Sequence, residues 1–124
     1  MSAENEKLVT DFCVSWSRKN VDEVLSYLTD DCFYHNIPME PCVGKAAIRA
    51  FVEPFLKNAE SAVFEIKNTT SAGNVVMNER VDRFVMGPKK IELPVSGVFE
   101  IRNGKIAAWR DYFDLTSFNK QMNG

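Results

Sequence analysis

The stretch IELPVSGVFEIR-NG-KIAAWRDYF, residues 91–113, indicates most about how this chain folds. Apolar and polar residues alternate along parts of both arms, as they do in strands that bury one face. Asn103-Gly104 joins the arms, and this dipeptide is a strong signal for a tight turn between antiparallel strands. The stretch therefore predicts a hairpin with strands at Ile91–Arg102 and Lys105–Phe113.

Further strands are expected upstream of this hairpin. Val63–Thr69 and Val75–Val85 follow the two-residue period for part of their length, and Gly87-Pro88 marks the turn that comes next. A shorter strand at Cys32–Ile37 leads into an irregular loop at 38–41. The second half of the chain is thus predicted to be mainly a meander of antiparallel strands.

Helical periodicity occupies most of the first half. Residues 4–19 predict an amphipathic helix, with Ser15 and Arg18 on its polar side. Asn20 is placed to cap a second, short helix that we expect to end near residues 29–31. Helices followed by antiparallel strands favour the α+β class.

Two more helices complete the prediction. One begins at Gly44, and Pro54 within its pattern should kink or end it. A short terminal helix places Leu115, Phe118 and Met122 on one side. No linker or repeat divides the chain, so residues 1–124 are expected to form a single domain. A curved sheet wrapped over three to four helices, making a cone with a cavity, is compatible with this pattern.

Composition excludes several classes of protein. Fifteen basic and seventeen acidic residues give a net charge of -2, which is not the basic footprint of a nucleic-acid-binding domain. No apolar run approaches the roughly 20 residues that span a bilayer, so we expect cytoplasmic residence without membrane insertion. The three cysteines, Cys13, Cys32 and Cys42, lack a CxxC pair, and His35 is the only histidine. This argues against a disulfide framework or a zinc site.

Three charged residues fall on strand faces that should point inward. Arg80 and Asp82 share one face of their strand, and Asp111 shares a face with Trp109 and Phe113. A carboxylate between two aromatic residues is costly to bury unless it is paired. A guanidinium can hold two carboxylates through separate donor pairs, so we predict one Asp-Arg-Asp network.

Two interpretations of this network remain open. It is either a structural ion network or a catalytic set in which one carboxyl holds a proton while the other stays ionised. Tyr34 and Asn36 share a strand face and could orient a water, or Tyr34 could be an ordinary core residue. His35 should point the other way, and Asp114 is expected at the strand end rather than in the site.

At these residues the chain resembles the limonene epoxide hydrolase family, within the cone-shaped superfamily of nuclear-transport-factor-like and SnoaL-like proteins. The resemblance extends over nearly the whole chain. It rests on Tyr34-x-Asn36, Glu79-Arg80-Val81-Asp82, Gly97-Val98-Phe99, Gly104-Lys105-Ile106 and Trp109-Arg110-Asp111-Tyr112-Phe113-Asp114-Leu115. It implies a curved mixed, largely antiparallel sheet around one deep cavity.

The resemblance also implies hydrolysis of an epoxide to a vicinal diol in one step, without a cofactor, a metal or a covalent intermediate. By analogy Asp111 is the general base, and it activates a water held by Asn36 and Tyr34. Asp82 is the general acid, and Arg80 bridges the two carboxylates. A poised acid and base suit this reaction, because water is a weak nucleophile and an alkoxide a poor leaving group.

The resemblance further implies an apolar substrate pocket and a homodimer formed through the outer face of the sheet. The expected pocket residues are Cys13, Trp16, Phe55, Phe84, Leu93, Val95, Phe113 and Phe118. Cys13, Trp16 and Phe84 depart from the members that act on terpene epoxides, which leaves the natural substrate open. The rivals are an isomerase or cyclase on the same scaffold and a non-catalytic module that binds small hydrophobic ligands.

Overall fold

A single six-stranded sheet organises the computed structural model, which describes residues 2–123. Its strand order is β2-β1-β6-β5-β4-β3. The strands are β1 (Leu28–Asn36), β2 (Cys42–Val43), β3 (Ser61–Ala72), β4 (Val75–Met86), β5 (Lys89–Arg102) and β6 (Lys105–Tyr112). The helices are α1 (Ser2–Ser15), α2 (Val21–Ser26), α3 (Lys45–Asn58) and α4 (Leu115–Asn123), with a 3-10 turn, η1 (Trp16–Arg18), after α1.

The predicted hairpin is present as β5 and β6. Asn103 and Gly104 both have positive φ angles, 52° and 74°, as a two-residue turn between twisted strands requires. The pairs β3–β4, β4–β5 and β5–β6 are antiparallel, while β1 pairs with β6 in parallel. The sheet is therefore mixed and largely antiparallel, and the predicted α+β class is confirmed.

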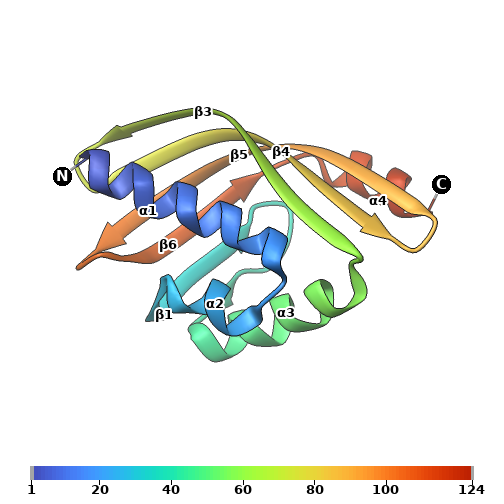
Figure 1. The fold of residues 1–124 in the computed structure, drawn as a ribbon, viewed down its shortest axis with the longest axis horizontal. Coiled ribbons are helices and arrows are strands. Elements are labelled where there is room, and N and C mark those ends of the chain that lie inside the picture. The colour runs from blue at the N-terminus through green and yellow to red at the C-terminus, as the bar shows by residue number, and fades with distance from the viewer. Residues whose placement is uncertain (1, 124) are drawn as a thin grey trace.

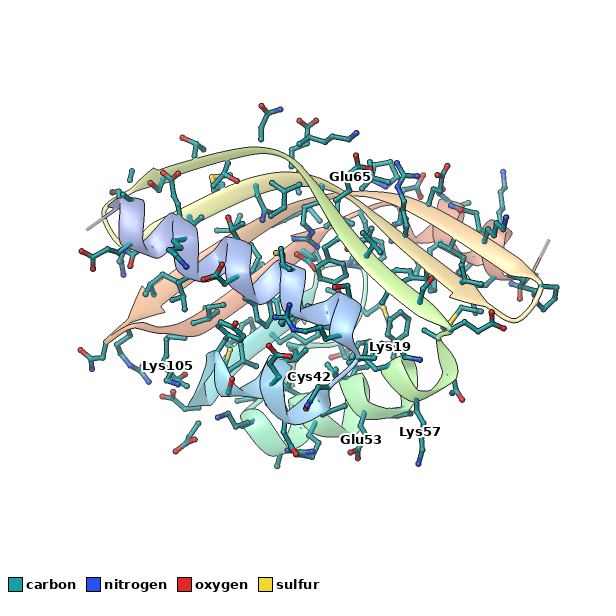
Figure 2. The ribbon with its side chains drawn as sticks, viewed as in Figure 1. Lys19, Cys42, Glu53, Lys57, Glu65 and Lys105 are labelled. Carbon is teal, nitrogen blue, oxygen red and sulfur yellow. The ribbon has the colours of Figure 1, made fainter. Side chains whose placement is uncertain are left out.

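The sheet curves over the helices, so that its concave face encloses the core (Figure 1). Helix α1 lies under β3 and β4, and α3 packs against β1 and β2. Helix α4 follows β6 and returns to contact β5. Glu53 and Lys57 of α3 project away from the sheet (Figure 2), while Val52 and Leu56 of that helix are buried.

The boundary between α2 and β1 differs from the prediction. Asn20 caps α2 by accepting a hydrogen bond from the backbone N–H of Glu23. However, α2 ends at Ser26. Residues 28–31, which we expected at the end of this helix, form the start of β1 instead. Leu28 pairs with Ile106 of β6, some eighty positions along the chain, so pairing with a distant strand overrides the local helical pattern. The short strand β2 was not predicted at all.

One further expectation about the helices is wrong, and one of two alternatives offered for another is excluded. Ser15 was placed on the polar side of its helix but is buried, because its hydroxyl donates to the carbonyl of Phe12 and needs no water. Pro54 does not end α3, which continues to Asn58. Pro54 and Ala50 are both exposed, so water can bond the carbonyl that a proline four residues later leaves free.

The core is a continuous cluster between the concave face of the sheet and the helices. Phe12 of α1 contacts Trp16, Tyr27, Phe99 and Trp109 edge to face. Within residues 2–123, no helix is both long and apolar enough to cross a bilayer. The buried polar residues of this core are Ser15, Asn78, Arg80, Asp82 and Asp111.

Candidate active site

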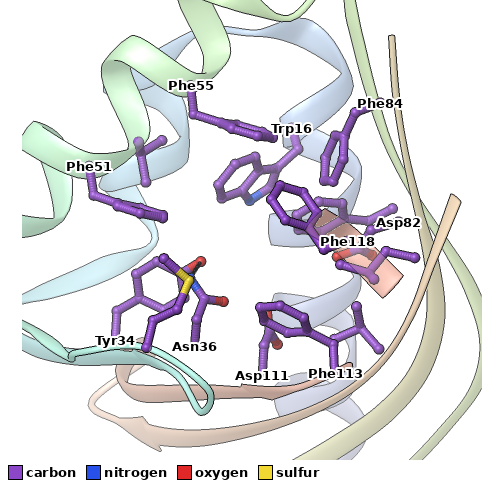
Figure 3. A pocket seen from close by; sticks show the side chains of 15 residues that line it. Trp16, Tyr34, Asn36, Phe51, Phe55, Asp82, Phe84, Asp111, Phe113 and Phe118 are labelled. Atoms are coloured by element: carbon purple, nitrogen blue, oxygen red, sulfur yellow. Dashed lines mark hydrogen bonds between the residues drawn. The ribbon is translucent and has the colours of Figure 1, made fainter. Parts of the chain in front are cut away.

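A cavity of about 240 Å³ opens between the concave face of the sheet and helices α3 and α4 (Figure 3). Most of its wall is aromatic or aliphatic, and the polar side chains are few. The lining residues are Trp16, Tyr34, Asn36, Met39, Phe51, Val52, Phe55, Phe64, Asp82, Phe84, Leu93, Val95, Asp111, Phe113 and Phe118. An apolar cavity with a few convergent polar groups is typical of a small-molecule site.

Arg80 joins the two carboxylates of the cavity wall. Its Nε and Nη2 donate to the two oxygens of Asp82, both at 2.9 Å. Its Nη1 and Nη2 donate to the two oxygens of Asp111, at 3.2 and 3.0 Å. All three side chains are buried, so the predicted Asp-Arg-Asp network is present with two-point contact on each carboxylate.

Asp111 is held from a second direction by Trp109. The indole Nε1 of Trp109 donates to Oδ1 of Asp111 at 2.8 Å. Trp109 is itself clamped between Tyr34 and Phe99, whose rings stack on it at centroid distances of 4.0 and 6.0 Å. Packing of the rings therefore fixes the orientation of one carboxylate of the pair.

Tyr34 and Asn36 lie beside Asp111 because β1 runs parallel to β6. The register pairs Tyr34 with Trp109 and Asn36 with Asp111. Nδ2 of Asn36 donates to the hydroxyl oxygen of Tyr34 at 2.8 Å, so the Tyr34 hydroxyl remains able to donate. Both residues line the cavity, and together they form a polar corner next to the Asp111 carboxylate.

Asn78 and Gly97 support the guanidinium, and neither was singled out from the sequence as part of the site. Oδ1 of buried Asn78 accepts from Nη1 of Arg80 at 3.2 Å. Gly97 of β5 lies between Asn78 of β4 and Asp111 of β6. A Cβ at Gly97 would stand 2.5 Å from Nη1 of Arg80, so the glycine leaves room for the guanidinium to reach across β5. A glycine inside a strand was the available signal.

Burial and neighbouring charges shift the pKa values of Asp82, Arg80 and Tyr34. Burial raises the pKa of Asp82 to about 6, although Arg80 opposes the shift. Burial would lower the pKa of Arg80, but Asp111 and Asp82 together raise it well above its usual value, so the guanidinium stays charged. Burial followed by the charge of Asp111 raises the pKa of Tyr34, which keeps its hydroxyl protonated.

The structure brings most of the predicted pocket residues to the cavity. Trp16, Phe55, Phe84, Leu93, Val95, Phe113 and Phe118 line it, and whether they contact a substrate stays a prediction. Cys13 does not line it. Cys13 is buried behind the wall, where its sulfur lies 3.7 Å from Nδ2 of Asn78, because its position on α1 directs it under β4.

Four apolar lining residues were missed: Met39, Phe51, Val52 and Phe64. Phe51 lies one helical turn before Phe55 on α3, a spacing that the sequence did display. Phe64 of β3 pairs with Asp82 of β4, and its ring lies 4.7 Å from Cζ of Arg80. The contact of Phe64 with this site depends on the register between β3 and β4, which no local pattern indicated.

Residues expected outside the site do lie outside it. Nε2 of His35 is 2.8 Å from the carbonyl oxygen of Met39, and Oδ1 of Asp114 caps α4 by accepting from the backbone N–H groups of Thr116 and Ser117.

Neither a cysteine nucleophile nor a metal site is found among the described residues. Burial raises the pKa of the Cys13 thiol to about 12, which keeps it in the unreactive thiol form. Among residues 2–123, no group of three or more His, Cys, Asp or Glu side chains is arranged to hold a metal ion.

The arrangement can exchange protons with a neutral, apolar molecule. Burial raises the pKa of Asp82 to about 6, so this carboxyl can exchange a proton near neutral pH, and Asp111 presents a second carboxyl to the same cavity. Two carboxyls joined by one guanidinium at the wall of an apolar cavity can supply an acid and a base together.

Comparisons with known proteins agree with this chemistry. The sequence model of the family described as "Limonene-1,2-epoxide hydrolase catalytic domain" matches residues 3–123. The epoxide hydrolase EphG of Mycobacterium tuberculosis is 33% identical over 116 residues, which cover 90% of this chain and 74% of EphG.

Solved structures extend the comparison to the fold. An LEH-like epoxide hydrolase of M. tuberculosis superposes with a TM-score of 0.87 at 27% identity, covering 99% of this chain and 92% of that chain. An NTF2-like protein of unknown function from Burkholderia pseudomallei superposes equally well, with a TM-score of 0.87, at 17% identity and full coverage of both chains. That second similarity concerns the fold alone, because one fold hosts many functions.

Proposed function

The chain belongs to the limonene-1,2-epoxide hydrolase family, and from this premise we propose that it hydrolyses a hydrophobic epoxide to a vicinal diol by general acid and base catalysis. The observation that carries the proposal is the bridge from Arg80 to Asp82 and Asp111 at the wall of an apolar cavity. An isomerase or a simple binding module would not require one guanidinium clamped between two buried carboxylates. The apolar wall suits a substrate whose only polar requirement is at the epoxide.

Asp111 is the general base in this proposal. It accepts hydrogen bonds from Arg80 and from Trp109, and each favours the carboxylate form. The polar corner of Tyr34 and Asn36 lies next to it, so a water held there would have its proton directed at Asp111. Fixing that water in line with the epoxide carbon contributes beyond the proton transfer itself.

Asp82 is the general acid. Its pKa, raised to about 6 by burial, leaves a protonated fraction near neutral pH that can donate to the epoxide oxygen. Arg80 contacts both carboxylates, so a change in the charge of one is felt by the other through the same guanidinium. Arg80 thereby acts as a positioning residue that holds the two carboxyls in a fixed relation to each other.

The reaction balances in one concerted step. The oxygen of water forms a bond to an epoxide carbon as that carbon's bond to the ring oxygen breaks. The water proton goes to Asp111 and the proton of Asp82 goes to the ring oxygen, which leaves a diol. Returning the proton from Asp111 to Asp82, directly or through solvent, restores the starting state.

The decisive test compares Asp111→Asn with Asp114→Asn. Asn at position 111 keeps the shape of the side chain but removes the base, so diol formation should fall by a factor of at least about 10². Asp114→Asn serves as the matched control, because asparagine also caps a helix and Asp114 lies outside the cavity. If the Asp111→Asn protein folds and retains most of its activity, Asp111 is not the base.

A single turnover in labelled water separates the one-step route from a covalent one. Direct attack puts the label into the diol in the first cycle. Label that enters an aspartate carboxyl first, with unlabelled diol released, would require an ester intermediate and contradict the proposal.

Family membership also motivates two wider expectations. A homodimer formed through the outer face of the sheet should appear in sedimentation velocity at micromolar concentration, and a monomer there would refute it. Cytoplasmic residence remains the expectation for the cellular location, to be checked by fractionation of the source cells.

A further inference from the structure

The indole N–H of Trp16 is a buried donor that faces the cavity without a partner. Trp16 is only 3% exposed, and its Nε1 makes no hydrogen bond to any of residues 2–123. Figure 3 shows the nitrogen on the edge of the indole that faces the open centre of the pocket. Buried N–H groups are nearly always paired, so an unpaired one at a cavity wall points to an acceptor on the bound molecule.

The indole is held firmly, so its direction is a fixed property of the site. It stacks on Phe64 with centroids 4.7 Å apart and an angle of 23° between the rings. It also meets Phe12 and Trp109 edge to face, at 6.2 and 5.7 Å. A donor fixed in this way discriminates between ligands without first losing freedom of motion.

The epoxide oxygen has its own partner in the proposed reaction, namely Asp82. Trp16 makes no hydrogen bond to that carboxyl, and its ring contacts are with aromatic residues of the described chain. Phe64 lies against Trp16 on one hand and against the guanidinium of Arg80 on the other. Because Asp82 takes the epoxide oxygen in the proposed reaction, the Trp16 donor is left for a second position on the substrate.

Charge and volume narrow the chemistry of that second position. With Asp82 protonated, as the proposed reaction requires, Arg80 and the two aspartates carry no net charge, so no positive charge is left to compensate an anionic substituent buried in this apolar cavity. An apolar cavity of about 150 Å³ is large enough for benzene, and this cavity measures about 240 Å³. A neutral molecule of one ring with a short substituent fits these limits.

We propose that Trp16 determines specificity by donating a hydrogen bond to a second, neutral oxygen of the substrate. The preferred substrates are then small apolar epoxides that carry a carbonyl, ether or ester oxygen in addition to the epoxide. This inference rests on the proposed hydrolase function for its substrate class, while the donor itself can be tested by binding alone.

The turnover test uses a pair of epoxides that differ in one atom position. Acetyl-cyclohexene oxide and isopropenyl-cyclohexene oxide differ by a carbonyl oxygen in place of a methylene group, and both ring isomers of each are assayed. The ratio of kcat/KM for ketone over alkene in wild type is divided by the same ratio in Trp16→Phe. We expect this quotient to be about 3 to 10, the worth of one net hydrogen bond.

Phe55→Leu is the matched control, because it trims an apolar wall residue that carries no donor. It should change kcat/KM for both epoxides by a similar factor and leave the ratio unchanged. A quotient near one for Trp16→Phe, with both substrates slowed alike, would show that Trp16 only shapes the wall and would overturn the inference. Circular dichroism on each variant verifies that the fold is retained.

Binding of the unreactive analogues acetylcyclohexane and isopropenylcyclohexane, measured by calorimetry, separates this inference from the hydrolase proposal. We expect Trp16→Phe to weaken binding of the ketone relative to the alkene by the same few-fold factor. If wild type turns over neither epoxide but the binding preference depends on Trp16, the hydrolase proposal fails and the donor stands. If turnover occurs and the preference does not depend on Trp16, the donor assignment fails alone.

Discussion

Each face of the sheet carries an arginine that contacts two carboxylates. The two arginines, Arg80 and Arg83, are three residues apart on β4. On the concave face Arg80 contacts Asp82 and Asp111, and the side chain of Arg80 is fully buried. On the convex face Arg83 contacts Glu65 and Glu92, and 39% of its side chain is exposed. Glu65 projects from the outer side of the sheet in Figure 2.

The difference between these clusters is one of solvent rather than of composition. Water and salt screen the outer charges, so that cluster contributes little to stability. The inner charges are removed from water and depend on one another for compensation. Burial raises the pKa of Asp82 to about 6, whereas hydrogen bonds from Arg83 lower the pKa of Glu65. The same arrangement of one arginine and two carboxylates is therefore removed from water only where the sheet curves inward.

The largest contrast is expected between Arg80→Ala and Arg83→Ala. Removing Arg80 strands two buried carboxylates and should cost about 3–5 kcal/mol of the free energy of unfolding, together with nearly all activity. Arg83→Ala should leave the activity close to that of wild type, and the melting temperature as well at protein concentrations below those at which the proposed homodimer forms. Equal destabilisation of the two variants in urea melts would contradict the distinction between the faces.

The second largest effect is expected in the pH dependence of activity, which should follow the protonation of Asp82. The acid form of Asp82 is present below its pKa of about 6 and is lost as the pH rises through that value. We therefore expect kcat/KM to approach a tenfold fall per pH unit on the alkaline side, which amounts to about 50-fold between pH 6 and 8. Arg83→Ala should show the same profile. A flat profile across this range would mean that the acid has a higher apparent pKa or that another group donates the proton.

Gly97→Ala should disturb the inner cluster by a smaller amount. The added methyl would meet Nη1 of Arg80 at 2.5 Å and Oδ1 of Asn78 at 3.0 Å, so the guanidinium must shift. Overpacking of this kind costs about 1–3 kcal/mol, and the shift of Arg80 should lower kcat more than it raises KM. Ser96→Ala, one residue earlier on the exposed side of β5, is the control and should be silent. Normal kinetics for Gly97→Ala would show that Arg80 tolerates displacement.

Salt provides the smallest and most selective test. Raising the ionic strength to 1 M shortens the screening length to about 3 Å, which should erase any difference in stability between wild type and Arg83→Ala. The difference between wild type and Arg80→Ala should persist, because salt does not enter the buried cluster. A salt-sensitive effect of Arg80→Ala on the melting temperature would indicate that solvent reaches the concave face.

Local patterns in the sequence were sufficient for the four strands of the second half of the chain and for the inward charges. Two-residue alternation placed Arg80 and Asp82 on one face and Asp111 on the inward face of its own strand, and the structure agrees. The Asn103-Gly104 turn followed from backbone preferences that depend on those two residues alone. The pattern failed at Leu28, where pairing with β6 extends β1 into residues that looked helical.

The sequence by itself determined the class of fold, the hairpin turns and which charges would be buried, because periodicity and turn chemistry are properties of neighbouring residues. Only the tertiary structure decided that Gly97 clears a path for Arg80, that Asn78 supports it, and that Cys13 lies behind the cavity wall. Only the tertiary structure left the N–H of Trp16 unpaired at the cavity. These features depend on how the curved sheet brings β4, β5, β6 and α1 together. No local stretch of residues determines how these elements are arranged relative to one another.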